Sequence, residues 1–249
     1  YTLWHTLSLH DALPIYLNRA QAQLQAIRPS SSQRIAVVPL DVAQSSQVQS
    51  TIAQVRQQHP NPTILINSAG VVYSDYFTNL SYQQFDQMIQ VNLYGTWNMI
   101  TAVHPVMRAH GGCIVNMASV AGFIGIFGYS GYSAAKFGVM GMSDALQYEL
   151  RQDHIHLAVV CPPDTDTPML KREQADLPPE TEMLTGNAGL LSPEDVAKAT
   201  LAGISRKKYR IIPGSEGKLI YYLTRFVPGI VRWKVLRKLH RYTQTHARE

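Results

Sequence analysis

Glycine is absent from the first part of this 249-residue chain. All 16 glycines lie at or after Gly70. Turns that cradle a phosphate group depend on glycine, because its lack of a side chain lets the backbone approach the ligand and open a helix at that point. The first 69 residues therefore contain no glycine-rich phosphate cradle.

Cysteine and long apolar runs are also scarce. The only cysteines are Cys113 and Cys161, which excludes a disulfide framework and favours a reducing compartment such as the cytoplasm. No apolar run approaches the roughly 18 residues that a membrane-spanning helix needs. The N-terminus lacks the basic start and apolar core of a secretory signal. We therefore expect a cytoplasmic protein with no transmembrane helix.

Charge is modest in amount and uneven in distribution. Charged residues make up 16% of the chain and the formal net charge is +5. Residues 218–249 carry a net charge of +7, whereas residues 1–217 carry −2. The 45% hydrophobic content is ordinary for a folded domain and excludes general disorder. The basic C-terminal segment predicts a local anionic partner, and its size and aromatic spacing argue against nucleic acid.

Short apolar runs alternate with segments of helical periodicity along most of the chain. The predicted strands cover 35–38, 63–66, 112–117, 155–160 and 209–212. The predicted helices cover 16–27, 46–58, 81–92, a second long segment to about 109, 132–151 and a segment that starts at Ser192. This alternation predicts an α/β fold, a Rossmann-like doubly wound parallel sheet flanked by helices. Ligands of such sheets bind beyond the carboxyl ends of the strands, where several polar motifs of this chain fall.

One group of polar residues predicts redox chemistry between a ketone and an alcohol. Tyr132 and Lys136 are four residues apart on a predicted helix and so share one face. An ammonium group beside a phenol favours the phenolate and brings its pKa toward the working range. Ser119, just after a strand, can hydrogen-bond and orient a carbonyl oxygen. Asn92, at a helix end, can hold a water against the lysine as a proton path.

These motifs resemble the short-chain dehydrogenase/reductase family over roughly residues 16–249. Asn92, Ser119, Tyr132 and Lys136 match its catalytic tetrad, and the segment 67–70 stands where the family has Asn-Asn-Ala-Gly. The resemblance implies that Tyr132 donates the proton in reduction and that Ser119 orients the carbonyl. It also implies that Lys136 holds the nicotinamide ribose and lowers the Tyr132 pKa, while a nicotinamide supplies the hydride.

The resemblance further implies a set of cofactor contacts. NADPH is the implied cofactor, and nothing in the sequence selects it over NADH. The implied cofactor-binding residues are Asp41, Asn67, Ala69, Gly70, Tyr132, Lys136, Pro162, Thr165 and Thr167. No metal site is predicted, because the histidines lack other ligands at metal-binding spacing.

The segment 161–168 indicates which branch of the family the chain resembles. Most family members have Pro-Gly where this chain has Pro162-Pro163, and the run Pro-Pro-Asp-Thr-Asp-Thr-Pro resembles the branch that reduces 3-ketodihydrosphingosine. That branch implies a long-chain keto-lipid substrate and a place in sphingolipid synthesis. The same residues also suit a proline-rich turn that ends a strand, with Asp164 and Asp166 as turn formers. A 3-oxoacyl thioester or a steroid ketone is an alternative substrate.

The C-terminal tail, residues 218–249, mixes apolar and basic residues at helical spacing. Trp233 and its apolar neighbours recur every third position with lysine and arginine between them, and the Pro228-Gly229 pair is expected to break the segment in two. This pattern predicts a helix that lies in an anionic membrane interface, which makes the protein peripherally membrane-associated. The alternative is a helix that packs on the substrate-binding region and exposes a basic face.

The start of the chain does not match the family. The family begins with a strand and a glycine-rich turn that cradles the cofactor diphosphate, and a second strand follows. Residues 8–15 instead resemble a translated sequencing adapter, and residues 1–15 show neither helical nor strand periodicity. We expect three segments: a non-native-looking stretch 1–15, a truncated reductase domain 16–217 and the basic tail 218–249. With the first strand missing, poor folding and weak dinucleotide binding are expected.

Two further expectations concern assembly and a rival function. By resemblance, the helices at about 94–109 and 132–151 form the face of a possible homodimer. If residues 1–15 are genuine, the chain is alternatively a non-catalytic, membrane-associated binding module that lacks the phosphate cradle.

Overall fold

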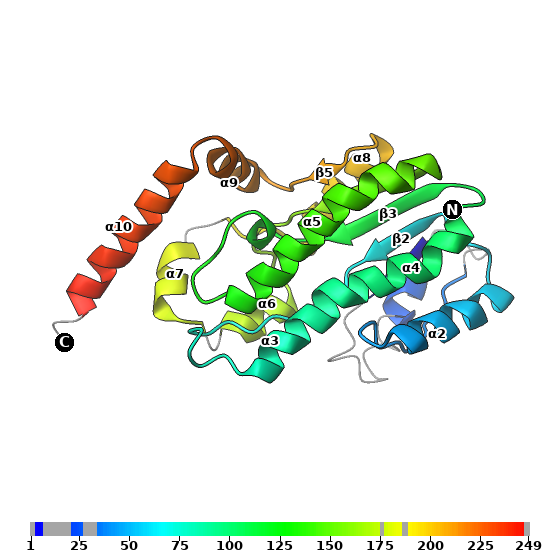
Figure 1. Cartoon of the computed structure of the whole chain (residues 1–249), viewed down its shortest axis with the longest axis horizontal. Coiled ribbons are helices and arrows are strands. Elements are labelled where there is room, and N and C mark those ends of the chain that lie inside the picture. The colour runs from blue at the N-terminus through cyan, green and yellow to red at the C-terminus, as the bar shows by residue number, and fades with distance from the viewer. Residues whose placement is uncertain (1–2, 7–20, 27–33, 175–176, 186–188, 247–249) are drawn as a thin grey trace.

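The computed structural model describes residues 3–6, 21–26, 34–174, 177–185 and 189–246, and their order is that of an α/β protein (Figure 1). The strands are β1 (Leu3–Thr6), β2 (Ile64–Asn67), β3 (Gly112–Met117), β4 (Ile155–Val160) and β5 (Arg210–Ile211). The helices are α2 (Ser45–Gln58), α3 (Tyr82–Ile89), α4 (Gly95–Met107), α5 (Ser130–Gln152), α6 (Pro168–Glu173), α7 (Pro179–Thr185), α8 (Pro193–Ser205), α9 (Ser215–Phe226) and α10 (Pro228–His246). A π-helical turn η1 (Gln90–Tyr94) and a 3-10 turn η2 (Val120–Gly122) connect them.

The five strands form one parallel sheet in the order β1-β2-β3-β4-β5. The register places Asn67 of β2 opposite Asn116 of β3, and Met117 of β3 opposite Val160 of β4. The carboxyl ends of the strands therefore lie along one edge, so the segments that follow them are neighbours in space. The predicted parallel sheet is confirmed.

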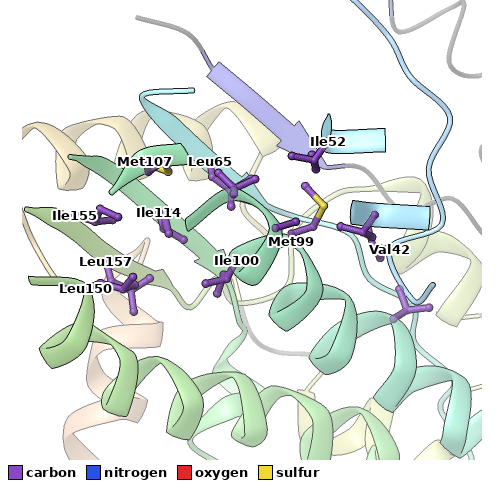
Figure 2. Packing of buried hydrophobic residues seen from close by; sticks show 14 of the residues in the cluster. Val42, Ile52, Leu65, Met99, Ile100, Met107, Ile114, Leu150, Ile155 and Leu157 are labelled. Carbon is purple, nitrogen blue, oxygen red and sulfur yellow. The ribbon is translucent and has the colours of Figure 1, made fainter. Parts of the chain in front are cut away.

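Successive side chains of a β-strand point to opposite faces of the sheet, so alternate strand residues enter two different hydrophobic clusters. On one face Leu65, Ile114 and Leu157 pack with residues of α2, α4 and α5, and Figure 2 shows this cluster. On the other face Val115 and Ala158 belong to a second cluster with residues of α8 and β5. The helices therefore cover both faces of the sheet, which explains why its strands are almost wholly apolar.

Two predictions near the N-terminus are wrong. Residues 35–38 are not a strand, because the described residues place no strand beside them to take up their hydrogen bonds. Leu3–Thr6, in the stretch expected to have no regular structure, instead forms β1 and pairs in parallel with β2. The edge of β2 offers unpaired backbone groups, and an extended segment satisfies them whatever its own periodicity. The strand β1 therefore occupies the edge of β2, although the first strand of the family was expected to be missing. Residues 7–15 lie outside the described residues.

Most other predicted helices and strands are confirmed within a few residues. The helix expected over 16–27 is present over 21–26, and its other residues are outside the description. Ser81 caps α3 through a capping box: its hydroxyl accepts a hydrogen bond from the Gln84 backbone, and the Gln84 side chain accepts one from the Ser81 backbone. The helix predicted through Asn92 ends instead in the π-helical η1. The short helices α6 and α7 were not predicted.

The tail forms two helices that meet at the predicted break. Helix α9 ends at Phe226, and α10 begins at Pro228, a residue well suited to a first helical turn because the missing N–H is not needed there. Figure 1 shows α10 extending away from the sheet toward the C-terminus, alongside α7. Within the described part of the chain, no helix is both long and apolar enough to cross a membrane.

Candidate active site

A buried chain of polar side chains crosses the carboxyl ends of β2 and β3. The Asn67 amide donates to Asn116 Oδ1 at 2.9 Å, and the Asn116 amide donates to Ser143 Oγ on α5 at 2.9 Å. The Oδ1 atom of Asn67 is buried and accepts no hydrogen bond in the described structure. An unsatisfied buried acceptor is costly, so this atom is a candidate to receive a ligand's donor.

Ser119 lies where β3 gives way to η2. Its side chain caps this turn by accepting a hydrogen bond from the Ala121 backbone at 3.1 Å. The same side chain lies near enough to the Tyr132 hydroxyl to lower the pKa of Tyr132. The capping bond holds the serine in place where β3 ends.

Tyr132 and Lys136 lie on one face of α5, as their spacing predicts. The Lys136 ammonium is 5.4 Å from the centre of the Tyr132 ring and donates to the Met117 carbonyl at 2.9 Å. Only 5% of Lys136 is exposed. The lysine is therefore fixed between the end of β3 and the tyrosine ring.

Burial governs the protonation of both groups. Burial raises the pKa of Tyr132 to about 12, the bond with Ser119 lowers it, and the charge of Asp164 raises it. Burial also lowers the pKa of Lys136 to about 8. The pKa of Tyr132 is thus raised by desolvation and not lowered as expected, and Tyr132 is a protonated phenol near neutral pH.

Asn92 lies in η1 and is almost fully buried. Its amide oxygen accepts from the Val71 backbone at 2.9 Å, and its amide nitrogen donates to the Val71 carbonyl at 2.8 Å. A Cβ atom on Gly70 would lie 2.8 Å from Asn92 Oδ1 and 3.8 Å from Lys136 Nζ, so only glycine leaves this approach open. Asn92 therefore clamps the loop after β2 beside the lysine. Its holding of a water remains a prediction.

The loop after β4 runs beside Ser119. The Pro162 carbonyl accepts from the Val120 backbone at 3.0 Å. The Thr165 hydroxyl donates to the Pro163 carbonyl at 2.9 Å, and the Thr167 hydroxyl caps α6. The structure thus brings Pro162 beside Ser119 of the candidate site, while the side chains of Thr165 and Thr167 have intramolecular partners.

Asp41 lies apart from this group. Its carboxyl accepts from the Ala43 backbone at 3.0 Å in the turn that precedes α2. Ala69 packs against the core on the α4 side of the sheet. The strand register and the described contacts place the following residues at one edge of the sheet: Asn67, Gly70, Asn92, Ser119, Tyr132, Lys136 and Pro162. They do not join Asp41 to it.

Four neighbours of the site were missed or given a lesser role by sequence reasoning. The Tyr129 ring centre is 6.1 Å from that of Tyr132, and the Tyr129 hydroxyl donates to Glu173, whose pKa burial raises to about 7. Asp164, predicted to be a turn former, acts electrostatically on Tyr132. Asn116 had a visible signal, since it is an amide inside an otherwise apolar strand; Glu173 lies on a short helix that no periodicity revealed.

The sequence of the chain matches a known protein family. The family model described as short chain dehydrogenase matches residues 10–178, more than half of the chain. The chain belongs to the short chain dehydrogenase family. This confirms the family resemblance drawn from Ser119, Tyr132 and Lys136.

Several curated relatives are reductases. The chain is 32% identical over 210 residues to 3-dehydrosphinganine reductase of Danio rerio, a match that covers 84% of this chain and 63% of that protein. It is 30% identical to 3-ketodihydrosphingosine reductase of Bos taurus with the same coverage. It is 28% identical to a 3-oxoacyl-[acyl-carrier-protein] reductase of Chlamydia trachomatis over 73% of each protein. The chain thus spans under two thirds of the length of the first two relatives.

Solved structures of low identity share the fold. A short chain dehydrogenase of Burkholderia cenocepacia in complex with NADP has a TM-score of 0.74 at 19% identity, covering 94% of this chain and 97% of that one. A short-chain dehydrogenase of Sphingobium yanoikuyae in complex with NADPH has a TM-score of 0.69 at 22% identity, covering 98% and 85%. The Rossmann-like architecture is therefore that of the family.

Proposed function

We propose that this protein is a nicotinamide-dependent reductase that converts a ketone to an alcohol. The observation that carries the proposal is the arrangement of Ser119, Tyr132 and Lys136 at the end of β3. Ser119 lies near enough to Tyr132 to lower its pKa, and the buried Lys136 ammonium lies beside the tyrosine ring. Two hydroxyl groups side by side can both hydrogen-bond one carbonyl oxygen and polarise it.

The two pKa values suit a proton relay in the direction of reduction. A phenol with a pKa of about 12 is fully protonated near neutral pH, so Tyr132 has a proton to give to the oxygen as it becomes an alkoxide. Lys136, with a pKa of about 8, is a stronger acid than an ordinary lysine and can return a proton to the phenolate. Ser119 orients the oxygen throughout.

The residues present fit the nicotinamide and ribose half of NADPH. Lys136 offers an ammonium donor, Gly70 leaves an approach that a side chain would close, and Asn67 Oδ1 is a buried acceptor without a partner in the described structure. When bound, the reduced nicotinamide supplies the hydride for the carbonyl carbon. Relatives of the same fold hold NADP or NADPH, which supports NADPH, and NADH is the alternative. The first 69 residues of the sequence contain no glycine, so these residues supply no glycine-rich turn for the diphosphate.

For the substrate we propose 3-ketodihydrosphingosine, which would be reduced to dihydrosphingosine. The support is the identity of 30% or more with the two reductases named for this substrate class, together with the run of residues 162–168. A 3-oxoacyl thioester is the second candidate, because the 28% identical relative acts on that class by its name. A steroid ketone is a third choice for the same chemistry.

The test is a substrate panel with the purified chain. NADPH loss is followed with the sphingoid ketone, a 3-oxoacyl thioester and a steroid ketone, and again with NADH. Preferred turnover of the sphingoid ketone supports the proposal, and preferred turnover of another ketone replaces the substrate. No turnover of any ketone, with tail-dependent lipid binding retained, would favour the non-catalytic binding module.

We also propose that the tail binds an anionic membrane surface. Phe226, Trp233 and Leu236 are 75%, 56% and 59% exposed on α9 and α10, although each is large and apolar. Basic residues lie between them, which suits insertion of the rings among lipid headgroups with cations at the surface. The start of α9 packs near the site: a Cβ atom on Gly217 would lie 3.7 Å from Val120 and 3.9 Å from Pro163. Membrane binding and packing on the site are therefore compatible.

Vesicle sedimentation tests the tail. The full chain should sediment with anionic vesicles at low salt, and deletion of residues 218–249 should abolish this. Since the deletion removes part of α9, a variant with Phe226, Trp233 and Leu236 all changed to Ser serves as the second test. Phe77→Ser, at a 79% exposed position outside the tail, is the matched control. Full-length protein that stays in the supernatant at low salt would refute this proposal.

A homodimer through α4 and α5 is the last part of the proposal. Tyr94, Trp97 and Phe137, on η1, α4 and α5, are 48%, 47% and 45% exposed. Exposed aromatic side chains on adjoining helices are typical of protein interfaces.

A further inference from the structure

The turn that leads into α5 is held by two segments that are distant in the sequence. The Thr181 hydroxyl of α7 donates to the Phe127 carbonyl at 2.9 Å, and the Asp75 backbone donates to the Gly128 carbonyl at 3.0 Å. A Cβ atom on Gly128 would lie 2.7 Å from the Thr181 hydroxyl oxygen, so α7 packs directly on this turn. Tyr129 is the last residue before α5, and its backbone is therefore held in a defined position.

The side chain of Tyr129 connects α6 with the candidate catalytic group. Its hydroxyl donates to the carboxyl of Glu173, the last residue of α6, and only 9% of Tyr129 is exposed. The ring of Tyr129 is inclined by 58° to the ring of Tyr132, and the two ring centres are 6.1 Å apart. Aromatic pairs at this separation attract each other. Tyr129 thus contacts the carboxyl with its hydroxyl and the Tyr132 ring with its own ring.

Helix α6 is also fixed at its other end. The Thr167 hydroxyl caps it by accepting a hydrogen bond from the Leu170 backbone at 3.3 Å, and the Asp166 backbone donates to the Leu191 carbonyl at 2.9 Å. Because both ends are held, the Glu173 carboxyl has little freedom to leave Tyr129.

Glu173 is partly buried, which is unfavourable for a carboxylate. Desolvation raises the pKa of Glu173 to about 7. A hydrogen bond from a phenol offsets part of the cost of removing a carboxyl from water. The bond from Tyr129 therefore explains how this acid is kept at the end of α6, beside the candidate site.

The position of the Tyr132 phenol matters because a proton is transferred only over hydrogen-bonding distance. A displacement of about 1 Å can lower the rate on the order of 100-fold. We propose that Glu173 and Tyr129 are positioning residues, in which the carboxyl holds the Tyr129 ring against the Tyr132 ring and so fixes the direction of the Tyr132 phenol. This role rests on the proposed reductase function and adds two residues that act through Tyr132.

A second tyrosine–glutamate pair of the same chain provides a matched control. The Tyr76 hydroxyl donates to the Glu180 carboxyl on α7 at 2.7 Å, and Tyr76 is 37% exposed. The two pairs have the same chemistry, but only the buried one contacts the Tyr132 ring through an aromatic pair. Tyr76→Phe and Glu180→Ala should therefore keep kcat within about twofold of wild type.

The kinetic experiment separates the hydrogen bond from the side chains that make it. With NADPH and the ketone that wild type prefers, kcat should fall about tenfold in Tyr129→Phe and in Glu173→Ala, while KM changes less than kcat. The double variant should lose no more than either single variant, because both substitutions break the same bond. Glu173→Gln keeps an oxygen that can accept from Tyr129, so it should restore most of the loss.

Two kinetic results would overturn the assignment. Full activity in Tyr129→Phe, which keeps the ring and loses only the hydroxyl, would show that the bond does not position Tyr132. Losses that multiply in the double variant would show that Tyr129 and Glu173 act independently. Urea denaturation of each variant checks that a lower kcat does not come from unfolded protein.

A spectroscopic measurement tests the positioning without any turnover. In protein labelled with carbon-13 at the tyrosine Cζ atom, the Tyr132 resonance is assigned by its absence in Tyr132→Phe. It should shift in Glu173→Ala, return toward the wild-type position in Glu173→Gln and stay unchanged in Glu180→Ala. If wild type reduces no ketone, the reductase proposal fails, and this shift alone decides the positioning. A Tyr132 resonance that is unchanged in Glu173→Ala would refute it.

Discussion

Tyr132 shows how the surroundings of a side chain set its chemistry. Its pKa rises to about 12 because it is buried, and Ser119 and Asp164 modify that value in opposite directions. The identity of the residue was predictable from its spacing to Lys136 and Ser119. The raised pKa was not, because desolvation depends on the segments that cover the ring, and these come from distant parts of the chain.

Replacing Tyr132 by Phe should lower kcat for ketone reduction about 10²- to 10⁴-fold, the usual contribution of a general acid. The fold should be unaffected, since only a hydroxyl is lost. Tyr82→Phe, at an 80% exposed position on α3, is the control and should keep full activity. Activity within threefold of wild type in Tyr132→Phe would remove the tyrosine from the mechanism.

The pKa of Lys136 predicts the pH dependence of reduction. Burial lowers it to about 8, so the ammonium is present below that pH and is lost above it. We expect kcat/KM for reduction to be level below about pH 8 and to fall about tenfold per pH unit above it. Lys136→Arg should keep its charge and move this limb to higher pH, whereas an unchanged limb would assign it to another group.

Helix ends in this chain follow their local sequence closely. Ser81 caps the start of α3, Ser192 caps the start of α8, and Pro228 is the first residue of α10 after the break. Capping is a contact between neighbours in the chain, which is why sequence reasoning located these ends. The π-helical η1 was not predictable, since the extra residue is accommodated by the clamp between Asn92 and the Val71 backbone.

Loss of the α3 capping box should be measurable. Ser81→Ala removes the acceptor of the Gln84 backbone and should lower the free energy of unfolding by about 1 kcal/mol, read from urea denaturation. Ser50→Ala, on the exposed side of α2, is the control and should change stability by less than about 0.5 kcal/mol. A Ser81→Ala variant as stable as the control would show that the cap contributes nothing.

The whole molecule joins a parallel sheet, a site at its carboxyl edge and a tail whose apolar side chains are exposed. Helix α9 packs beside η2, with the Phe123 and Tyr221 rings 5.3 Å apart, and α10 contacts α7. This arrangement supports delivery of a lipid from a membrane to the site. The division into segments 1–15, 16–217 and 218–249 remains a prediction.

Assembly is testable by one substitution. Trp97→Arg on α4 places a charge beside the exposed aromatic residues of η1 and α5 and should convert a dimer to a monomer in light scattering. Leu201→Arg, at a 61% exposed position on α8, is the control and should leave the mass unchanged. A wild-type monomer, or a Trp97→Arg dimer, would refute an interface through α4 and α5.

The sequence by itself determined the alternation of strands and helices, the residues of the candidate catalytic group, and the two-helix tail with its break. These features depend on residues that are close together in the chain: the periodicity of apolar residues, the spacing of Tyr132 and Lys136, and the residues that cap helices. Tertiary structure alone decided that Leu3–Thr6 is a strand and that 35–38 is not, because a strand needs a neighbour with free hydrogen-bonding groups. It also decided that the charge of Asp164 raises the pKa of Tyr132, because the loops that follow β3 and β4 start from neighbouring strand ends.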